Sequence, residues 1–164
     1  MAHAPQSQAV DDSRDIPEQR IIRVLAHAPA DQIAEKLNAY SKTDRSGIPK
    51  WHFIRKPEAG LVMVRGRMGG SGGAFNFGEV TVTRAAVALS DGVTGFSYAL
   101  GRDQKKAEQA AIIHALWKTA AHTQRVEADI IGPLEALNMA REQAVREEVA
   151  PTKVDFYTLV RGDD

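Results

Sequence analysis

The sequence contains no cysteine. Disulfides, thiolate–zinc sites, iron–sulfur ligation and a cysteine nucleophile are therefore excluded. An excess of charge is also lacking, because 21 Lys and Arg residues balance 21 Asp and Glu residues. Proteins dedicated to nucleic acids or to anionic membranes depend on a surplus of cations. The charge balance therefore argues against both of these partners.

Long apolar runs are missing as well. None approaches the ~20 residues that a membrane-spanning helix needs, and the N-terminal segment lacks the apolar stretch of a signal peptide. We therefore expect a cytoplasmic protein without membrane association. Residues 1–16 have few large apolar side chains and are expected to form a disordered tail. A single domain is expected over residues 17–164.

Helical spacing of apolar residues marks both ends of the chain. From Ile21 to Tyr40 the pattern predicts two helices, with a break near His27–Ala30 because Pro29 cannot continue a helix. Asp103 is expected to cap a central helix. The segment Ile130–Pro133 predicts the end of one helix and the start of another, since proline is tolerated in a first turn.

The middle of the chain has the alternation of β-strands. Two short strands are expected at Trp51–Arg55 and Leu61–Met68, separated by a turn at Pro57–Gly60. A longer strand at Phe77–Leu89 leads into a hairpin turn at Asp91–Gly92.

The strand after this turn presents Phe96, Tyr98 and Leu100 on one face, which we predict to be core, with an interface as the alternative. A last strand is expected at Val154–Val160. The order of helices, antiparallel strands, helices and strand indicates an α+β fold. It consists of a mainly antiparallel sheet packed with N-terminal and C-terminal helices.

A glycine-rich loop at Gly69–Gly73 is the most conspicuous motif. Small residues let backbone amides approach a phosphate, and Arg65, Arg67 and Arg84 offer charge to such a ligand. The loop lacks the Gly-Lys-Ser/Thr ending of a nucleotide-binding P-loop, however, and leads into a strand instead of a helix. A hairpin loop without a ligand is therefore the favoured interpretation.

The histidines form no metal-binding signature, so no metal site is predicted. His52, His114 and His122 are interpreted as solvated or structural residues. His27 lies at the predicted helix break, where it either serves a site or caps a helix end. No serine or carboxylate has the neighbours of a nucleophile or a base. No catalytic residue is therefore predicted.

Five segments occur in the order and with the spacing of one family. The sequence resembles the PhnG family of the bacterial carbon–phosphorus lyase machinery over residues 19–163. The segments that carry this resemblance are Leu25–Ala28 with Leu37–Ala39, Arg67–Gly72, Thr81–Val87 with Asp91–Gly92, Gly101–Asp103 with Ala107–Glu108, and Val154–Asp163.

The resemblance implies a non-autonomous subunit that assembles with PhnH, PhnI and PhnJ. Together with PhnI, PhnH and PhnL, a PhnG subunit is expected to support transfer of a phosphonate to ribose C1 of MgATP, with displacement of adenine. MgATP is thus expected as a substrate of the complex, and no cofactor is expected for this chain itself.

The charged surroundings of the glycine loop lead to a hypothesis about a shared surface. It places five residues against a PhnI-like partner: Arg67, Gly69, Gly70, Gly72 and Arg84. Two alternatives stay open. One is an autonomous phosphate-ester or nucleotide-binding enzyme with the glycine loop as its cradle. The other is a scaffold that stabilises the PhnI-like partner and never touches substrate.

Overall fold

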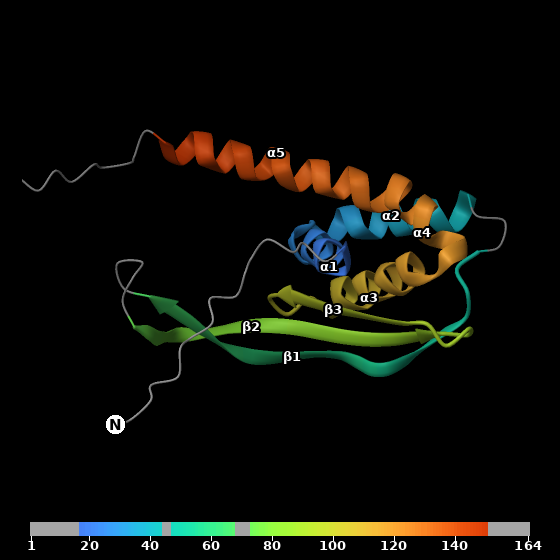
Figure 1. Cartoon of the computed structure of the whole chain (residues 1–164), viewed down its shortest axis with the longest axis horizontal. Coiled ribbons are helices and arrows are strands. Elements are labelled where there is room, and N and C mark those ends of the chain that lie inside the picture. The colour runs from blue at the N-terminus through green and yellow to red at the C-terminus, as the bar shows by residue number, and fades with distance from the viewer. Residues whose placement is uncertain (1–16, 44–46, 68–72, 151–164) are drawn as a thin grey trace, which may run out of the picture.

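The computed structural model describes residues 17–43, 47–67 and 73–150. The predicted disordered tail, the glycine loop at residues 69, 70 and 72, and the predicted last strand at 154–160 lie outside the described residues. Figure 1 shows a sheet of three strands with all of the helices on one of its faces. The expected α+β class is confirmed.

Two helices open the fold, as the sequence predicts. α1 spans Pro17–His27 and α2 spans Ala30–Thr43. The break between them lies at Ala28 and Pro29. Ala28 still donates its N–H to an α1 carbonyl, whereas Pro29, which has no N–H, contributes only its carbonyl to the next helix. The stretch from Ile21 to Tyr40 therefore forms two helices that both bury an apolar side.

The sheet has the order β1–β2–β3, and both pairings are antiparallel. β1 spans Trp51–Arg67, β2 spans Ala74–Leu89 and β3 spans Thr94–Leu100. The predicted turn at Pro57–Gly60 is wrong, because β1 continues through this segment. The register of β1 shifts on the N-terminal side of Glu58, so Pro57 occupies an irregular part of an edge strand, where a missing N–H breaks no ladder bond.

The hairpin turn between β2 and β3 is confirmed at Asp91–Gly92. Gly92 has φ +86°, and its N–H donates to the Leu89 carbonyl at 2.9 Å. This left-handed conformation is one that glycine adopts without strain. Asp91 accepts a hydrogen bond from the Val93 N–H at 3.0 Å, which fixes the other side of the turn.

The two faces of β3 are the reverse of the prediction. Its small residues Gly95, Ser97 and Ala99 are buried against the helices, and its large residues are exposed. The cause lies in the close approach of the next helix: a Cβ at Gly95 would lie 2.2 Å from the carbonyl oxygen of Ala111. Only small side chains fit between this strand and that helix, so the large ones occupy the other face.

The remaining helices follow in one nearly continuous run. α3 spans Gln104–Lys118, α4 spans Ala120–Val126, a π-helical turn η1 spans Glu127–Ile131, and α5 spans Gly132–Val149. The predicted cap is confirmed, because the Asp103 side chain accepts a hydrogen bond from an N–H in the first turn of α3 at 2.8 Å.

The predicted helix start with proline in its first turn is confirmed, because α5 begins at Gly132 and Pro133 follows directly. The predicted break before this start is wrong, since η1 leads straight into α5. The chain stays helical there, and the N–H of Gly132 bonds to the carbonyl of Glu127, five residues earlier. This wider turn accommodates Pro133 without a break, because π-turns are inserted into helices that continue on both sides.

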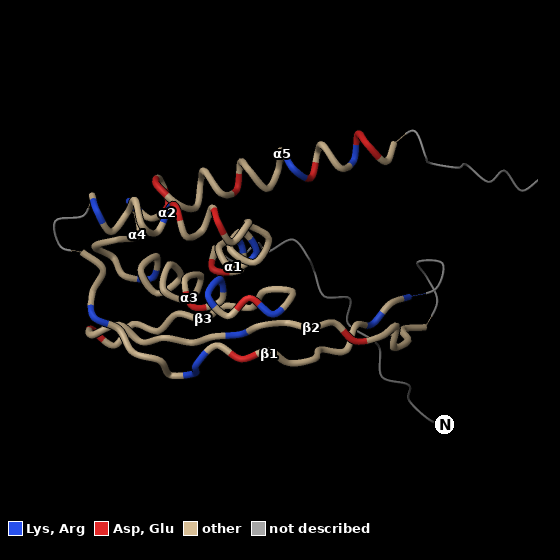
Figure 2. The backbone as a smooth tube through the Cα atoms, turned by 180° about the vertical axis from the view of Figure 1, so that it is seen from behind, with Lys and Arg blue, Asp and Glu red and all other residues tan. Residues whose placement is uncertain are grey.

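The core lies between the helical layer and the covered face of the sheet. It is built from apolar residues of α1, α2, β2, α3, α4, η1 and α5, the largest being Tyr40, Ile21, Ile33, Leu89, Ile113, Leu116, Ile130, Ile131 and Leu134. In the part of the chain that the structure describes, no helix is long and apolar enough to cross a membrane. Acidic and basic residues are interspersed over helices and sheet, and long stretches of β1 and β2 are uncharged (Figure 2).

Candidate functional site

The residues proposed from the sequence lie in three separate places. Arg67 ends β1 beside the glycine loop, whereas Arg84 lies in the middle of β2. Arg84 is ten residues further along β2 than Ala74, which is roughly 33 Å at ~3.3 Å per residue. His27 ends α1 in the helical layer. Arg84 therefore lies far from the strand ends that the glycine loop connects.

Arg84 belongs to a cluster of charged residues on the sheet. Its Nε and Nη2 both lie 2.8 Å from Glu58 Oε1, and Arg55 Nη1 contacts the same carboxylate oxygen at 2.5 Å. A hydrogen bond with Tyr98, followed by that with Glu58, raises the pKa of Arg84. The two guanidinium groups, Arg55 before Arg84, lower the pKa of Glu58. The charge of Arg84 is thus engaged within the chain.

The arginines at the end of β1 have a different environment. None of the described residues forms an ion pair with Arg65 or Arg67. Both side chains are exposed, on the part of β1 and β2 that extends beyond β3 and α3 (Figure 1). Their cationic charge is available to an anionic ligand or to a partner.

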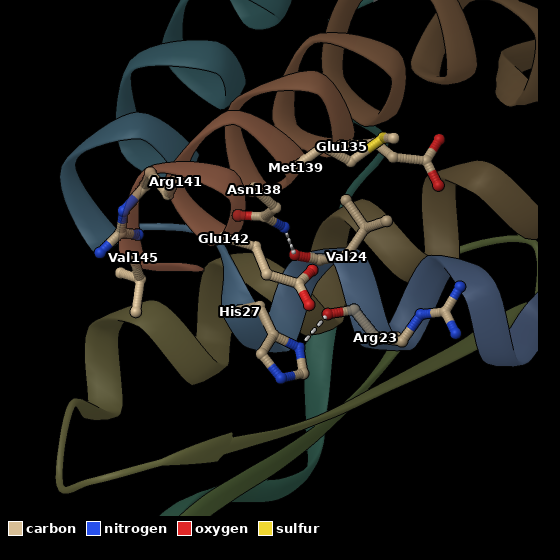
Figure 3. A pocket seen from close by; sticks show the side chains of 9 residues that line it. All are labelled: Arg23, Val24, His27, Glu135, Asn138, Met139, Arg141, Glu142 and Val145. Carbon is tan, nitrogen blue, oxygen red and sulfur yellow. Dashed lines mark hydrogen bonds between the residues drawn. The ribbon is translucent and has the colours of Figure 1, made fainter. Parts of the chain in front are cut away.

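His27 lies at a groove between α1 and α5 (Figure 3). The groove has a volume of roughly 940 Å³, and α1 contributes Arg23, Val24 and His27 to its wall. Nδ1 of His27 is 2.8 Å from the Arg23 carbonyl, one turn earlier in the same helix. The contact with a carbonyl at a helix end agrees with one of the two predicted roles of His27. Its role in a site stays a prediction.

The α5 wall of the groove mixes charge with apolar side chains. It consists of Glu135, Asn138, Met139, Arg141, Glu142 and Val145. Asn138 donates from Nδ2 to the Val24 carbonyl at 3.0 Å, and this contact joins the two helices. Its Oδ1 is buried and has no hydrogen-bond partner among the described residues. A donor from an occupant of the groove would satisfy this acceptor.

Arg20 of α1 joins this helix to α5 and to η1 beside the groove. Arg20 donates from Nε and Nη2 to the two carboxylate oxygens of Glu135, at 3.0 and 2.6 Å, and also pairs with Glu127. Glu127 in turn accepts a hydrogen bond from the Trp117 Nε1–H at 2.9 Å. Arg20 lowers the pKa of Glu135, mainly through its hydrogen bonds. These groups fix helices relative to one another and are not free for catalysis.

Comparison with known protein families identifies the family of this chain. A family described as "Phosphonate metabolism protein PhnG" matches residues 17–162. The chain belongs to the PhnG family. It is also 43% identical, over 143 residues, to a protein of Rhizobium meliloti (strain 1021) named "Alpha-D-ribose 1-methylphosphonate 5-triphosphate synthase subunit PhnG". That match covers 87% of this chain and 88% of the relative.

Two histidines of this PhnG-family chain are structural, as the sequence predicts. His122 is nearly buried, and its Nδ1 lies 2.8 Å from the hydroxyl of Tyr40. His114 is fully buried, with Nδ1 3.1 Å from both the backbone nitrogen and the carbonyl oxygen of Phe96. No group of three potential metal-ligating side chains occurs among the residues described.

The sequence reasoning missed two features of this PhnG-family chain. One is the groove, because α1 and α5 are about 115 positions apart and no local motif announces their contact. The other is the large apolar surface on the uncovered face of the sheet. Large and small side chains alternate along β3, which indicates that one face is apolar, but the alternation does not show which of the two faces the helices cover.

Proposed function

We propose that this chain is a non-autonomous subunit of an enzyme that attaches a phosphonate to a ribose triphosphate. The observation that carries the proposal is its 43% identity, along 87% of its own length, to a protein named as a subunit of such a synthase. The charged groups described above support it. Most of them are engaged in ion pairs within the chain, and among the described residues no nucleophile, base and anion-binding group come together.

The reaction proposed for the whole complex is a substitution at ribose C1 of MgATP. A phosphonate oxygen forms the bond to C1, the bond from C1 to adenine breaks, and adenine leaves with the electron pair and takes up a proton. PhnI-, PhnH- and PhnL-like proteins are proposed as the other participants, and a PhnJ-like protein as a further member of the core complex. We place this complex in the cytoplasm. This chain supplies no cofactor, and MgATP is a substrate.

Within this complex, the end of the β1–β2 projection is proposed to meet the PhnI-like partner. Arg67 has no ion-pair partner among the described residues, and it is the last residue of β1, in the part of the strand that extends beyond β3. Arg84 is the contrasting position, because Glu58 and Tyr98 engage its guanidinium group. Arg67→Ala should therefore weaken assembly or turnover more than Arg84→Ala.

Co-expression with PhnH-, PhnI- and PhnJ-like proteins tests the proposal. A tag on this chain should recover a complex of several different subunits, whose composition is measured by native mass spectrometry. The control is the same tagged chain expressed alone. A soluble chain that recovers none of the three proteins would contradict a subunit role and would direct attention to ligand binding by the isolated protein.

A scaffold role without substrate contact is the second candidate, and the uncovered apolar face of the sheet favours it. The two candidates differ in what Arg67→Ala should do to an assembled complex. If Arg67 contributes to the reaction, the purified variant complex forms normally and releases adenine more slowly. In the scaffold case, complexes of equal composition release adenine at equal rates.

A further inference from the structure

The sheet has one covered face and one open face. In β2, Thr83, Ala85, Val87 and Leu89 are buried under the helices, and β3 buries Gly95, Ser97 and Ala99 on the same side. Side chains alternate along a strand, so the residues between them lie on the opposite side. Figure 1 shows no helix on that opposite side.

Large apolar side chains occupy the open face over its whole length. On β3 they are Phe96, Tyr98 and Leu100, which pair with Ala86, Arg84 and Val82 of β2. At the other end, the Phe75 ring lies 3.8 Å from the Cβ position of Gly66 and 6.3 Å from the ring of Phe77. Seven such side chains are between 37% and 76% exposed: Ile54, Val62, Phe75, Phe77, Phe96, Tyr98 and Leu100.

The exposed area is large for a chain that works alone. With about 200 Å² for a fully exposed large side chain, these seven residues expose on the order of 700 Å². The largest apolar patch of a typical monomer is ~300–600 Å². One partner of a standard protein–protein interface contributes ~800 Å². The open face therefore has the size and the apolar character of one half of an interface.

The charges on the open face indicate what kind of partner covers it. Arg55 and Arg84 share the single carboxylate of Glu58, so this cluster has a net charge of +1. Packing of the face on a second copy about a two-fold axis would bring two clusters of the same sign together, which opposes self-association. A different protein with an acidic side chain at this place would instead be complementary.

We propose that the open face binds another protein subunit of the synthase, which presents an apolar surface with an acidic side chain opposite Arg55 and Arg84. This inference rests on the proposed function, because it names the surface through which the chain joins its complex. The surface differs from the loop region and from the groove between α1 and α5. Residues of all three strands form it, so it exists only in the folded chain.

Charge substitutions at highly exposed positions test the proposal without disturbing the core. Phe77→Glu lies toward the end of the open face that β1 and β2 form, Leu100→Glu lies on β3 beside Val82, and both side chains are more than 70% exposed in the isolated chain. Val149→Glu on α5, at a side chain that is 54% exposed and outside the groove lining, is the matched control for a new carboxylate elsewhere. Circular dichroism and Tm of each isolated variant first establish that it folds as the wild type does.

Affinity for the co-expressed PhnH-, PhnI- and PhnJ-like subunits is then measured by titration of labelled chain. Both open-face variants should bind about 30-fold more weakly or worse, because each places a carboxylate against the apolar surface of the partner. Val149→Glu should bind within about threefold of the wild type. If both open-face variants retain wild-type affinity, the proposal is overturned, whatever the control does.

The possible outcomes of this experiment distinguish a failure of the inference from a failure of the proposed function. A wild-type chain that binds none of the subunits contradicts the proposed function and the inference together. A wild-type chain that binds, alongside open-face variants that bind equally well, contradicts the inference alone. If the isolated wild type is a dimer by light scattering and Leu100→Glu makes it a monomer without weakening subunit binding, the face is a self-interface and the proposal is wrong.

Discussion

Gly95 is the position at which β3 and α3 approach most closely, and it allows a sharp test of the packing. In Gly95→Ala the new Cβ would lie 2.2 Å from the Ala111 carbonyl oxygen, 2.4 Å from the Ala115 backbone nitrogen and 2.7 Å from the Ala115 Cβ. All three distances are far below van der Waals contact. Two of the three atoms belong to the helix backbone, so no side-chain rotation relieves the clash.

The expected loss of stability in Gly95→Ala follows from the movement of α3 or β3 that the new Cβ requires. Either α3 shifts away from the sheet or β3 bends, and both loosen the contacts of buried residues such as Ile113. Overpacking of a core costs about 1–3 kcal/mol, and a clash with backbone belongs at the upper end. For a chain of this size, about 3 kcal/mol corresponds to a fall in Tm of roughly 6–12 °C.

The assay is thermal unfolding followed by circular dichroism, with Gly60→Ala as the matched control. Gly60 lies in the same sheet, in β1, and a Cβ there meets no atom within 4 Å. Gly60→Ala should therefore leave Tm unchanged or slightly raised, because alanine loses less entropy on folding. A Tm of Gly95→Ala within about 1 °C of the wild type would refute the close approach of α3 to β3.

Two further predictions concern the helical layer. Arg20→Met removes the bidentate pair with Glu135, whose carboxylate is about one-third exposed. This should lower the free energy of unfolding, measured by urea titration, by about 1–2 kcal/mol. An unchanged free energy of unfolding would show that the pair is not formed in solution. Burial lowers the pKa of His114, although Glu18, at 3.2 Å from its Nε2, opposes this shift. The unfolded chain then binds the extra proton below pH ~6.5, so stability should fall as the pH is lowered from 7 toward 5. His114→Gln should make this part of the pH dependence flatter, and equal slopes in the variant and the wild type would contradict the assignment.

Local chemistry made part of the fold predictable from the sequence. Pro29 marks a helix break because proline lacks an N–H, and Asp103 caps α3 because its carboxylate accepts a hydrogen bond from a free N–H. Gly92 forms the turn because it adopts a positive φ without strain. Each of these features depends on a few neighbouring residues, so a single sequence contains the necessary information.

The features that were missed depend on contacts between distant segments. Phe96 and its neighbours on the same face were assigned to the core because large apolar side chains are usually buried. The deciding fact was the proximity of α3 to Gly95, which the alternation of β3 does not reveal. β1 was divided at Pro57 because proline usually ends a strand, but a register shift on an edge strand accommodates it.

The candidate site was the least predictable part. Arg84 was grouped with the glycine loop because its charge could complement a phosphate there, yet roughly 33 Å of extended strand separates Arg84 from Ala74, where β2 begins. The partner of Arg84 is Glu58, which lies on the neighbouring strand. The role of Arg67 and of the loop in binding a PhnI-like protein stays a prediction.

The most direct test of the central claim is release of adenine from MgATP in the presence of a phosphonate, measured on a reconstituted mixture of PhnI-, PhnH- and PhnL-like proteins with and without this chain. A subunit role predicts rapid adenine release only when the chain is present, and none from the chain alone. Equal rates with and without the chain would contradict the account.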